Sequence, residues 1–212
     1  MVEEIRARWT AKNLARDSAL QHARELTRYC AHSIRATHRG EFPLAAELLA
    51  SARAVAATVQ KELASYPDLN EAGYTQDALK ELAEAHIVYA LVAGQPLPTP
   101  EALGVDDAAY LNGLGEAMGE LRRHVLDLIR RGQVERCEPF LNVMDEVYTA
   151  LMTLDFPDAL TGGLRRTSDM VRGVVERTRG DLTVAIRQEE LQAALRALEE
   201  RIRLPREAED AP

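Results

Sequence analysis

Proline and glycine clusters divide the chain into long segments, and each long segment has the composition of a helix. The strongest break is residues 94–100 (GQPLPTP), because proline fixes φ, lacks an N–H group and cannot continue a helix. Weaker breaks fall near Gly40, Pro67, Gly132 and Pro157. Between them apolar residues recur at helical spacing, and no segment alternates with the period of two that is typical of strands. This pattern of helical segments separated by proline and glycine breaks favours a helical bundle.

The breaks predict the helices and their order. Ala, Leu, Arg and Glu dominate the segments between the breaks, and these side chains lose little rotamer freedom in a helix. We expect helices over residues 3–38, 43–65, 75–93, 107–131, 137–154 and 158–203, with a loop at 68–74 and a single turn ending at Gly104. The fold is therefore predicted to be all-α, a single-domain bundle of six or seven helices spanning 3–203. Residues 204–212 are expected to form an acidic, disordered tail.

Charge and composition limit the possible functions. The formal net charge of −8 argues against a protein that is basic over its whole surface, so binding of nucleic acid would require a local basic stripe. The two cysteines, Cys30 and Cys137, lie in unrelated segments and are interpreted as buried free thiols. No run approaches the roughly 20 apolar residues that span a bilayer, and residues 1–4 lack the features of a signal peptide. These features predict a cytoplasmic protein that does not contact a membrane.

The expected helix 75–93 carries a pair of acidic residues, Glu81 and Glu84, three positions apart on one face. The residues that follow, 85–92, are apolar nearly all round, which predicts a buried helix. Carboxylates on a buried helix need partners or a metal ion. Alternatively, the first half of this helix projects into water. His86 lies on the apolar face and is interpreted as a core histidine.

The expected helix 107–131 carries a second acidic pair, Glu116 and Glu120, four positions apart. An apolar stripe at 3.6 periodicity lies on the other side of this helix, so the pair alone is typical of a solvated face. Glu120 and His124 are also four apart and could share a metal. However, the Glu-x-x-His pairs of di-iron bundles are absent.

The expected first helix carries a stripe of arginines. The residues that fall within about a quarter of the helical wheel are Arg24, Arg28, His32, Arg35 and Arg39. A stripe of one sign could follow a phosphate backbone. The alternative is a solvated arginine face without a ligand.

The order and spacing of several short motifs resemble the translin/TRAX family. Residues 110–123 (YLNGLGEAMGELRR) are similar to the most distinctive stretch of TRAX, in which a Tyr-Leu-x-Gly opening leads to an acidic residue and then to Glu-Leu-basic. Residues 15–17 (ARD) followed by Arg24 are similar to the Ser-Arg-Asp and Lys-Arg of TRAX. Gly132, residues 140–154, 175–176 (VE) and 181–182 (DL) continue the similarity, which covers most of residues 12–190.

The resemblance implies a translin-like fold and a function. In TRAX a Glu-x-x-Glu pair and a later Asp-x-x-x-Glu pair form a ribonuclease site. The matching residues here are Glu81, Glu84, Glu116 and Glu120, with Glu116 in place of the aspartate. Four carboxylates without histidine or thiolate would select Mg²⁺ or Mn²⁺, which would make the chain a metal-dependent endoribonuclease.

The resemblance also implies how RNA is bound. Arg16, Arg24, Arg28, Arg35 and Arg39 would bind the backbone of RNA, or of single-stranded DNA, inside a homo-oligomeric shell, an octamer in this family. The alternative functions are a translin-like protein that binds RNA or single-stranded DNA without cutting it, and a helical scaffold with solvated charged faces.

Overall fold

The computed structural model describes residues 1–209, with side chains for residues 1–202. Within that range the chain is helical and contains no strand, as predicted from the sequence. The elements in chain order are α1 (Val2–His38), α2 (Phe42–Leu63), α3 (Pro67–Asn70), α4 (Gly73–Ala93), α5 (Pro100–Leu103), α6 (Asp107–Arg130), η1 (Val134–Arg136), α7 (Glu138–Met152), α8 (Asp158–Thr161) and α9 (Leu164–Glu209).

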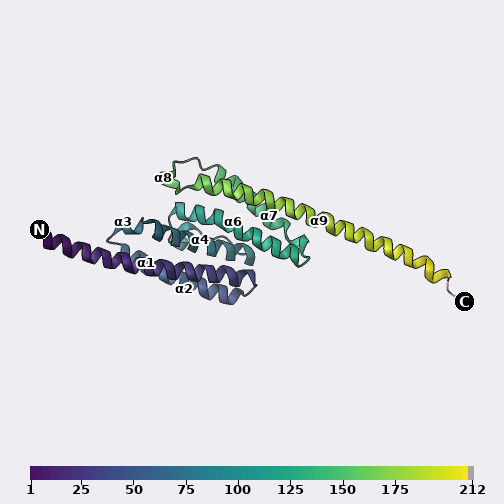
Figure 1. Cartoon of the computed structure of the whole chain (residues 1–212), viewed down its shortest axis with the longest axis horizontal. Helices are drawn as coiled ribbons and strands as arrows, with labels where there is room; N and C mark the ends of the chain where they lie inside the picture. The colour runs from purple at the N-terminus through teal and green to yellow at the C-terminus, as the bar shows by residue number, and fades with distance from the viewer. Residues whose placement is uncertain (210–212) are drawn as a thin grey trace.

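The long helices form an elongated bundle of three layers (Figure 1). α1 and α2 pack together on one side, α4 and α6 lie in the middle, and α7 and α9 cover the other side. The N-terminal end of α1 and the C-terminal end of α9 extend beyond the bundle in opposite directions (Figure 1). The middle layer is therefore covered on both sides, which places any chemistry on α4 and α6 at the centre of the molecule.

The core is centred on α4 and α6. Their side chains that are fully buried include Leu82, Ile87, Met118 and Leu121. Fully burying a side chain of this size contributes about 1.5–3 kcal/mol. Residues 85–92 of α4 are apolar on nearly every side. A helix without a polar face must be covered all round, which explains why α4 lies at the centre of the bundle.

Two local predictions were wrong in detail. The predicted loop 68–74 contains α3, which begins at Pro67 and buries Leu69 against Val59 and Leu63 of α2. Proline suits the first turn of a helix, where its missing N–H group would be unpaired in any case, and burial of Leu69 stabilises the single turn.

The expected C-terminal helix 158–203 is divided at Gly162 and Gly163 into α8 and α9, and α9 itself is one continuous helix. α9 passes through Gly173 and Gly180 without a break, because Val171, Val175 and Leu182 pack on the bundle. The expected tail begins inside this helix, which continues to Glu209; residues 210–212 lie outside the described part of the chain.

α2 is the only helix among residues 1–209 that is long and apolar enough, by length and composition, to cross a membrane. No such segment was expected from the sequence. The hydropathy of α2 comes largely from alanine and leucine, and Ala45, Leu49 and Ala52 pack inside the bundle. Its exposed face carries Glu47 and Lys61. A helix in the core of a bundle can therefore have the length and the hydropathy of a membrane-spanning helix.

Candidate metal centre and nucleic-acid surface

Gly113 allows α6 to approach α4 at the point where the acidic pairs meet. A Cβ atom at Gly113 would lie 2.7 Å from the carbonyl oxygen of Lys80 and 3.0 Å from the backbone nitrogen of Glu84. Such contacts are closer than van der Waals packing permits, so a side chain at this position would force the helices apart. Glu116 follows Gly113 by three residues and therefore also faces α4.

Three of the four predicted acidic residues converge there. Glu81 and Glu84 of α4 and Glu116 of α6 each place one carboxylate oxygen within 4.8 Å of the others. Glu84 is buried, and Glu81 and Glu116 are half-buried. We call these three residues the acid cluster. Glu116 and Glu120 are both half-buried, so the alternative of a solvated face on α6 does not hold.

The acid cluster lacks sufficient positive charge to balance it. Burial, followed by the charges of Glu81, Glu116 and Glu120, raises the pKa of Glu84 to about 8. Burial and the charge of Glu116 also raise the pKa of Glu81. Carboxylates so close together repel one another unless protons or cations neutralise them.

The donors of the acid cluster fit a hard divalent cation. All three side chains are carboxylates, and oxygen ligands are those that Mg²⁺ and Mn²⁺ prefer. The nearest thiol does not alter this selection: burial, and then the charges of Glu81 and Glu84, hold the pKa of Cys30 above its ordinary range. Cys30 therefore stays protonated. Cys30 and Cys137 are both buried and free, as predicted.

The fourth predicted acidic residue, Glu120, lies beside the acid cluster and has its own partners. Its Oε2 atom is 2.6 Å from Nε2 of His38 and 3.7 Å from Nη1 of Arg123. The hydrogen bond with His38 lowers the pKa of Glu120. Its negative charge still acts on the acid cluster, since it raises the pKa values of Glu81 and Glu84.

Sequence reasoning missed two residues of this site, Lys80 and His38. Nζ of Lys80 lies 2.7 Å from Oε1 of Glu116 and partly neutralises the cluster. Burial alone would lower the pKa of Lys80, but the bond and charge of Glu116 raise it above its ordinary value. The available signals were weak: Lys80 directly precedes the Glu-x-x-Glu pair, and His38 follows the core residue Ile34 by one helical turn.

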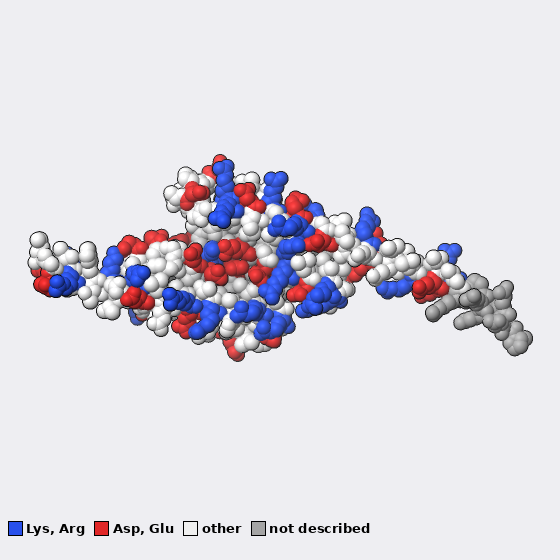
Figure 2. Space-filling view, in the orientation of Figure 1, with Lys and Arg blue, Asp and Glu red and all other residues white. Residues whose placement is uncertain are grey.

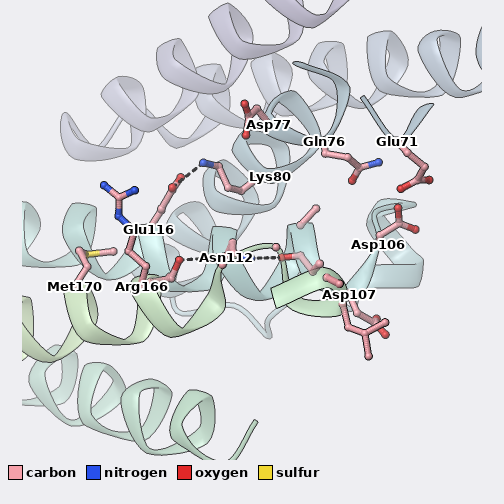
Figure 3. A pocket seen from close by; sticks show the side chains of 17 residues that line it. Glu71, Gln76, Asp77, Lys80, Asp106, Asp107, Asn112, Glu116, Arg166 and Met170 are labelled. Carbon is pink, nitrogen blue, oxygen red and sulfur yellow. Dashed lines mark hydrogen bonds and ion pairs between the residues drawn. The ribbon is translucent and has the colours of Figure 1, made fainter. Parts of the chain in front are cut away.

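A cleft of about 1010 Å³ opens beside Lys80 and Glu116 (Figure 3). Arg166 of α9 extends along the same end of the cleft, and further acidic side chains line its other end (Figure 3). Asn112 forms part of its wall. Its amide nitrogen donates to the carbonyl oxygens of Ala108 and Thr161, and its oxygen accepts from the hydroxyl of Thr167. These bonds tie α6 to α8 and α9, so this wall of the cleft is fixed.

The five arginines that the family resemblance predicted to bind nucleic acid are all exposed, on α1 or at its C-cap. They are Arg16, Arg24, Arg28, Arg35 and Arg39. Asp17, Glu25 and Glu41 pair with Arg16, Arg28 and Arg39, respectively. Within the described residues, Arg24 and Arg35 form no ion pair and are free to bind an external anion. We call the five arginines the arginine face.

The arginine face and the acid cluster are neighbours in space. His38, which bonds to Glu120, lies in the last turn of α1 beside Arg35 and Arg39. Figure 2 shows acidic side chains gathered near the middle of one face of the molecule, with Lys and Arg over α1 along one side of them. A polyanion held along α1 would thus pass close to the carboxylates.

The remaining histidine candidates are packing residues. His86 is half-buried, and burial followed by the charge of Arg53 lowers its pKa to about 4. His124 packs edge-on against Phe140 and stacks on His38, and burial lowers its pKa to about 4 as well. Neither belongs to the acid cluster.

Comparison with known proteins identifies related structures. AfC3PO in complex with duplex RNA aligns with a TM-score of 0.75 at 34% identity, covering 87% of this chain and 95% of that one. The crystal structure of AfC3PO aligns with a TM-score of 0.80 at 35% identity over 87% and 96%. Apo-NeC3PO, at 20% identity and a TM-score of 0.80, shares the fold.

Sequence comparison adds one relative. An uncharacterized protein of Methanocaldococcus jannaschii is 28% identical over 191 residues, which are 89% of this chain and 84% of the relative. No family profile matches the chain. The identity with AfC3PO over nearly its whole length is sufficient to assign the family. The chain belongs to the translin/TRAX-type family of C3PO proteins.

Proposed function

We propose that the protein is a Mg²⁺- or Mn²⁺-dependent endoribonuclease that binds RNA along α1 and hydrolyses its phosphodiester bonds at the acid cluster. The observation that carries the proposal is the convergence of Glu81, Glu84 and Glu116 within 4.8 Å. Three partly buried carboxylates with little compensating charge are unfavourable for stability alone. A role in holding a divalent cation explains why they lie together.

The arginine face supports the binding part of the proposal. Arginines on one side of a helix can neutralise successive phosphates, and such contacts fix the register of the nucleic acid without reading its sequence. AfC3PO, a structural relative, is described in complex with duplex RNA. RNA is therefore the proposed substrate, with single-stranded DNA as a further ligand of the same face.

Each residue of the site has a task in the proposed reaction. Glu81, Glu84 and Glu116 would hold the cation, with Glu120 beside them. When bound, the divalent ion would supply Lewis-acid activation of water and neutralise charge on the phosphoryl group. Lys80, once released from Glu116, would be free to pair with a phosphate oxygen at the edge of the cleft. The arginine face would hold the RNA backbone in place during the reaction.

The proposed assembly is a homo-oligomer, an octamer. Large apolar side chains are exposed at both projecting ends of the molecule, including Trp9 and Leu14 on α1 and Leu191, Leu195 and Leu198 on α9. The three leucines of α9 recur at helical spacing and share one face, and an exposed apolar face is typical of surfaces that bind another chain. Light scattering should give about 188 kDa, corresponding to eight chains of 23.5 kDa. A monomer at micromolar concentration would contradict the assembly.

Incubation of labelled RNA with the protein, in Mg²⁺ or in EDTA, tests the activity. Cleavage should require the metal and should fall by orders of magnitude in Glu81→Gln and Glu116→Gln, which keep the shape of the side chain but remove its charge. Glu146→Gln, at an exposed position on α7, is the matched control and should cleave normally. Near-normal cleavage by both cluster variants would exclude the acid cluster as the active site.

A second candidate function is RNA or single-stranded DNA binding without turnover. The observation that favours it is the engagement of two acidic residues by basic partners, Glu116 by Lys80 and Glu120 by His38. A protein of this kind would retain RNA on a filter in EDTA and leave it intact in Mg²⁺. A helical scaffold would show no salt-dependent retention at all.

A further inference from the structure

His38 is a buried polar residue with a single partner. Its side chain is 4% exposed, and its Nε2 atom lies 2.6 Å from Oε2 of Glu120. The other ring nitrogen, Nδ1, is buried without a hydrogen-bond partner among the described residues. An unpaired buried polar atom costs free energy, so an aliphatic side chain would suit this position better if packing were its only role.

The neighbours of His38 fix its ring. His124 stacks on it with ring centroids 6.2 Å apart, and Phe140 packs edge-on against His124 at 4.9 Å. The imidazole therefore offers Nε2 to Glu120 from a position set by α1, α6 and α7. Glu120 itself is 28% exposed and would otherwise sample several rotamers.

We propose that His38 is a positioning residue that holds Oε2 of Glu120, so that the carboxylate stays beside the acid cluster and completes the divalent cation site. The inference rests on the proposed function. It extends that function to a residue outside the carboxylate set, and it ties the helix of the arginine face to the cation site through one hydrogen bond. Partners of this kind fix the orientation of a carboxylate, and their loss costs about 10–100-fold in metal affinity.

The test is Mn²⁺ binding to the full-length protein, followed by the electron paramagnetic resonance signal of the free ion. His38→Ala should weaken Mn²⁺ binding by about 10–100-fold. His38→Gln should recover most of that loss, because the glutamine amide can donate from nearly the position of Nε2. His22→Ala is the matched control: His22 also lies on α1 beside a glutamate, with Nδ1 3.3 Å from Oε2 of Glu62. It should bind Mn²⁺ like the parent.

A double-mutant cycle separates positioning from a general effect on packing. In a Glu120→Gln background, His38→Ala should cause little further loss of Mn²⁺ affinity, because its effect is exerted through the Glu120 carboxylate. Fully additive losses, or parental Mn²⁺ affinity in His38→Ala, would overturn the inference. Circular dichroism melting of each variant reports the loss of packing. His38→Gln and His38→Ala should have similar melting temperatures, whereas their Mn²⁺ affinities should differ clearly.

The same proteins distinguish failure of this inference from failure of the proposed function. A parent protein that binds Mn²⁺ but leaves RNA intact overturns the catalytic proposal. The inference about His38 is then decided by the Mn²⁺ affinity of His38→Ala relative to the parent. A parent that cleaves RNA, with an unchanged Mn²⁺ affinity in His38→Ala, overturns the inference alone. A parent that binds no Mn²⁺ overturns both.

Discussion

Gly113 of α6 lies so close to Lys80 of α4 that a Cβ atom there would be 2.7 Å from the Lys80 carbonyl oxygen. Because the neighbour is backbone, it cannot move aside as a flexible side chain could. The close approach of the two helices brings Glu116 to Glu81 and Glu84. The geometry of the acid cluster therefore depends on the absence of a side chain at position 113.

Gly113→Ala should lower the free energy of unfolding and weaken Mn²⁺ binding together. Overpacking of this kind costs about 1–3 kcal/mol, and separation of α6 from α4 should move Glu116 away from the other two acids. Urea unfolding and Mn²⁺ titration measure the two effects. The control is Gly119→Ala in the same helix, where a Cβ atom meets nothing within 4 Å. It should stabilise by about 0.5–1 kcal/mol, and equal effects at both positions would contradict the packing argument.

Helix boundaries were predictable because their signals are local. Gly40, Gly94 and Gly132 adopt positive φ values of 75°, 67° and 69° and lie where the sequence predicted the ends of helices. α3 escaped prediction because its stability comes from the burial of Leu69, which depends on α1 and α2. The helix was expected to continue through Gly173 and Gly180, and it does, since glycine disfavours a helix by only about 1 kcal/mol.

The site was predictable in part for the same reason. Their spacing on one helix indicated that Glu81 and Glu84 share a face. The family resemblance then predicted that Glu116 and Glu120 belong to the same site. The contacts of Lys80 with Glu116 and of His38 with Glu120 join residues 36 and 82 positions apart in the chain. Nothing in a local pattern specifies them, because they arise from the way that α1, α4 and α6 pack.

Without metal, the protein should lose stability as the pH rises from about 5 to 9. The pKa of Glu84 is about 8 in the folded chain against an ordinary value of 4.5. Between these values the folded state holds a proton that the unfolded state has lost, and this contribution to stability disappears as the pH passes the folded pKa. Urea unfolding in EDTA at pH 6 and pH 9 should show the decrease.

Glu84→Gln should flatten this pH dependence and should be more stable than the parent at pH 9 in EDTA. Its amide cannot ionise, so the repulsion within the acid cluster stays low at high pH. Mg²⁺ should restore the stability of the parent at pH 9 but have little effect on the variant, because ligand binding stabilises only a chain that retains its site. An identical pH slope in both proteins would refute the assignment of this titration to Glu84.

Lys80→Met should tighten Mn²⁺ binding severalfold and destabilise the metal-free protein. The ammonium group of Lys80 lies 2.7 Å from Glu116 and competes with a cation for the same carboxylate. Its removal leaves the acid cluster more negative, which favours the ion and disfavours the empty site. Lys61→Met, on the exposed face of α2, is the control. Weaker Mn²⁺ binding in Lys80→Met would show that Lys80 supports the site and does not compete with the ion.

The last prediction separates RNA binding from RNA cleavage by means of the arginine face. Changing Arg24, Arg28 and Arg35 together to Gln should weaken RNA binding, with little dependence on sequence. For a single strand each lost phosphate contact changes the slope of log K against log salt by about 0.7. The triple variant should therefore flatten that slope by about 2 units. Filter binding of labelled RNA at several salt concentrations measures it.

Two comparisons make this result specific to the arginine face. A control triple variant at Arg130, Arg172 and Arg177, all exposed on α6 and α9, removes the same formal charge and should keep the parental slope. Glu81→Gln should bind RNA at least as well as the parent while losing cleavage, because removing a negative charge near the phosphates reduces repulsion. An unchanged slope in the α1 variant would show that its arginines are only solvated. RNA would then have to reach the acid cluster by another path, and the cleft lined by Lys80 and Arg166 would be the first place to look.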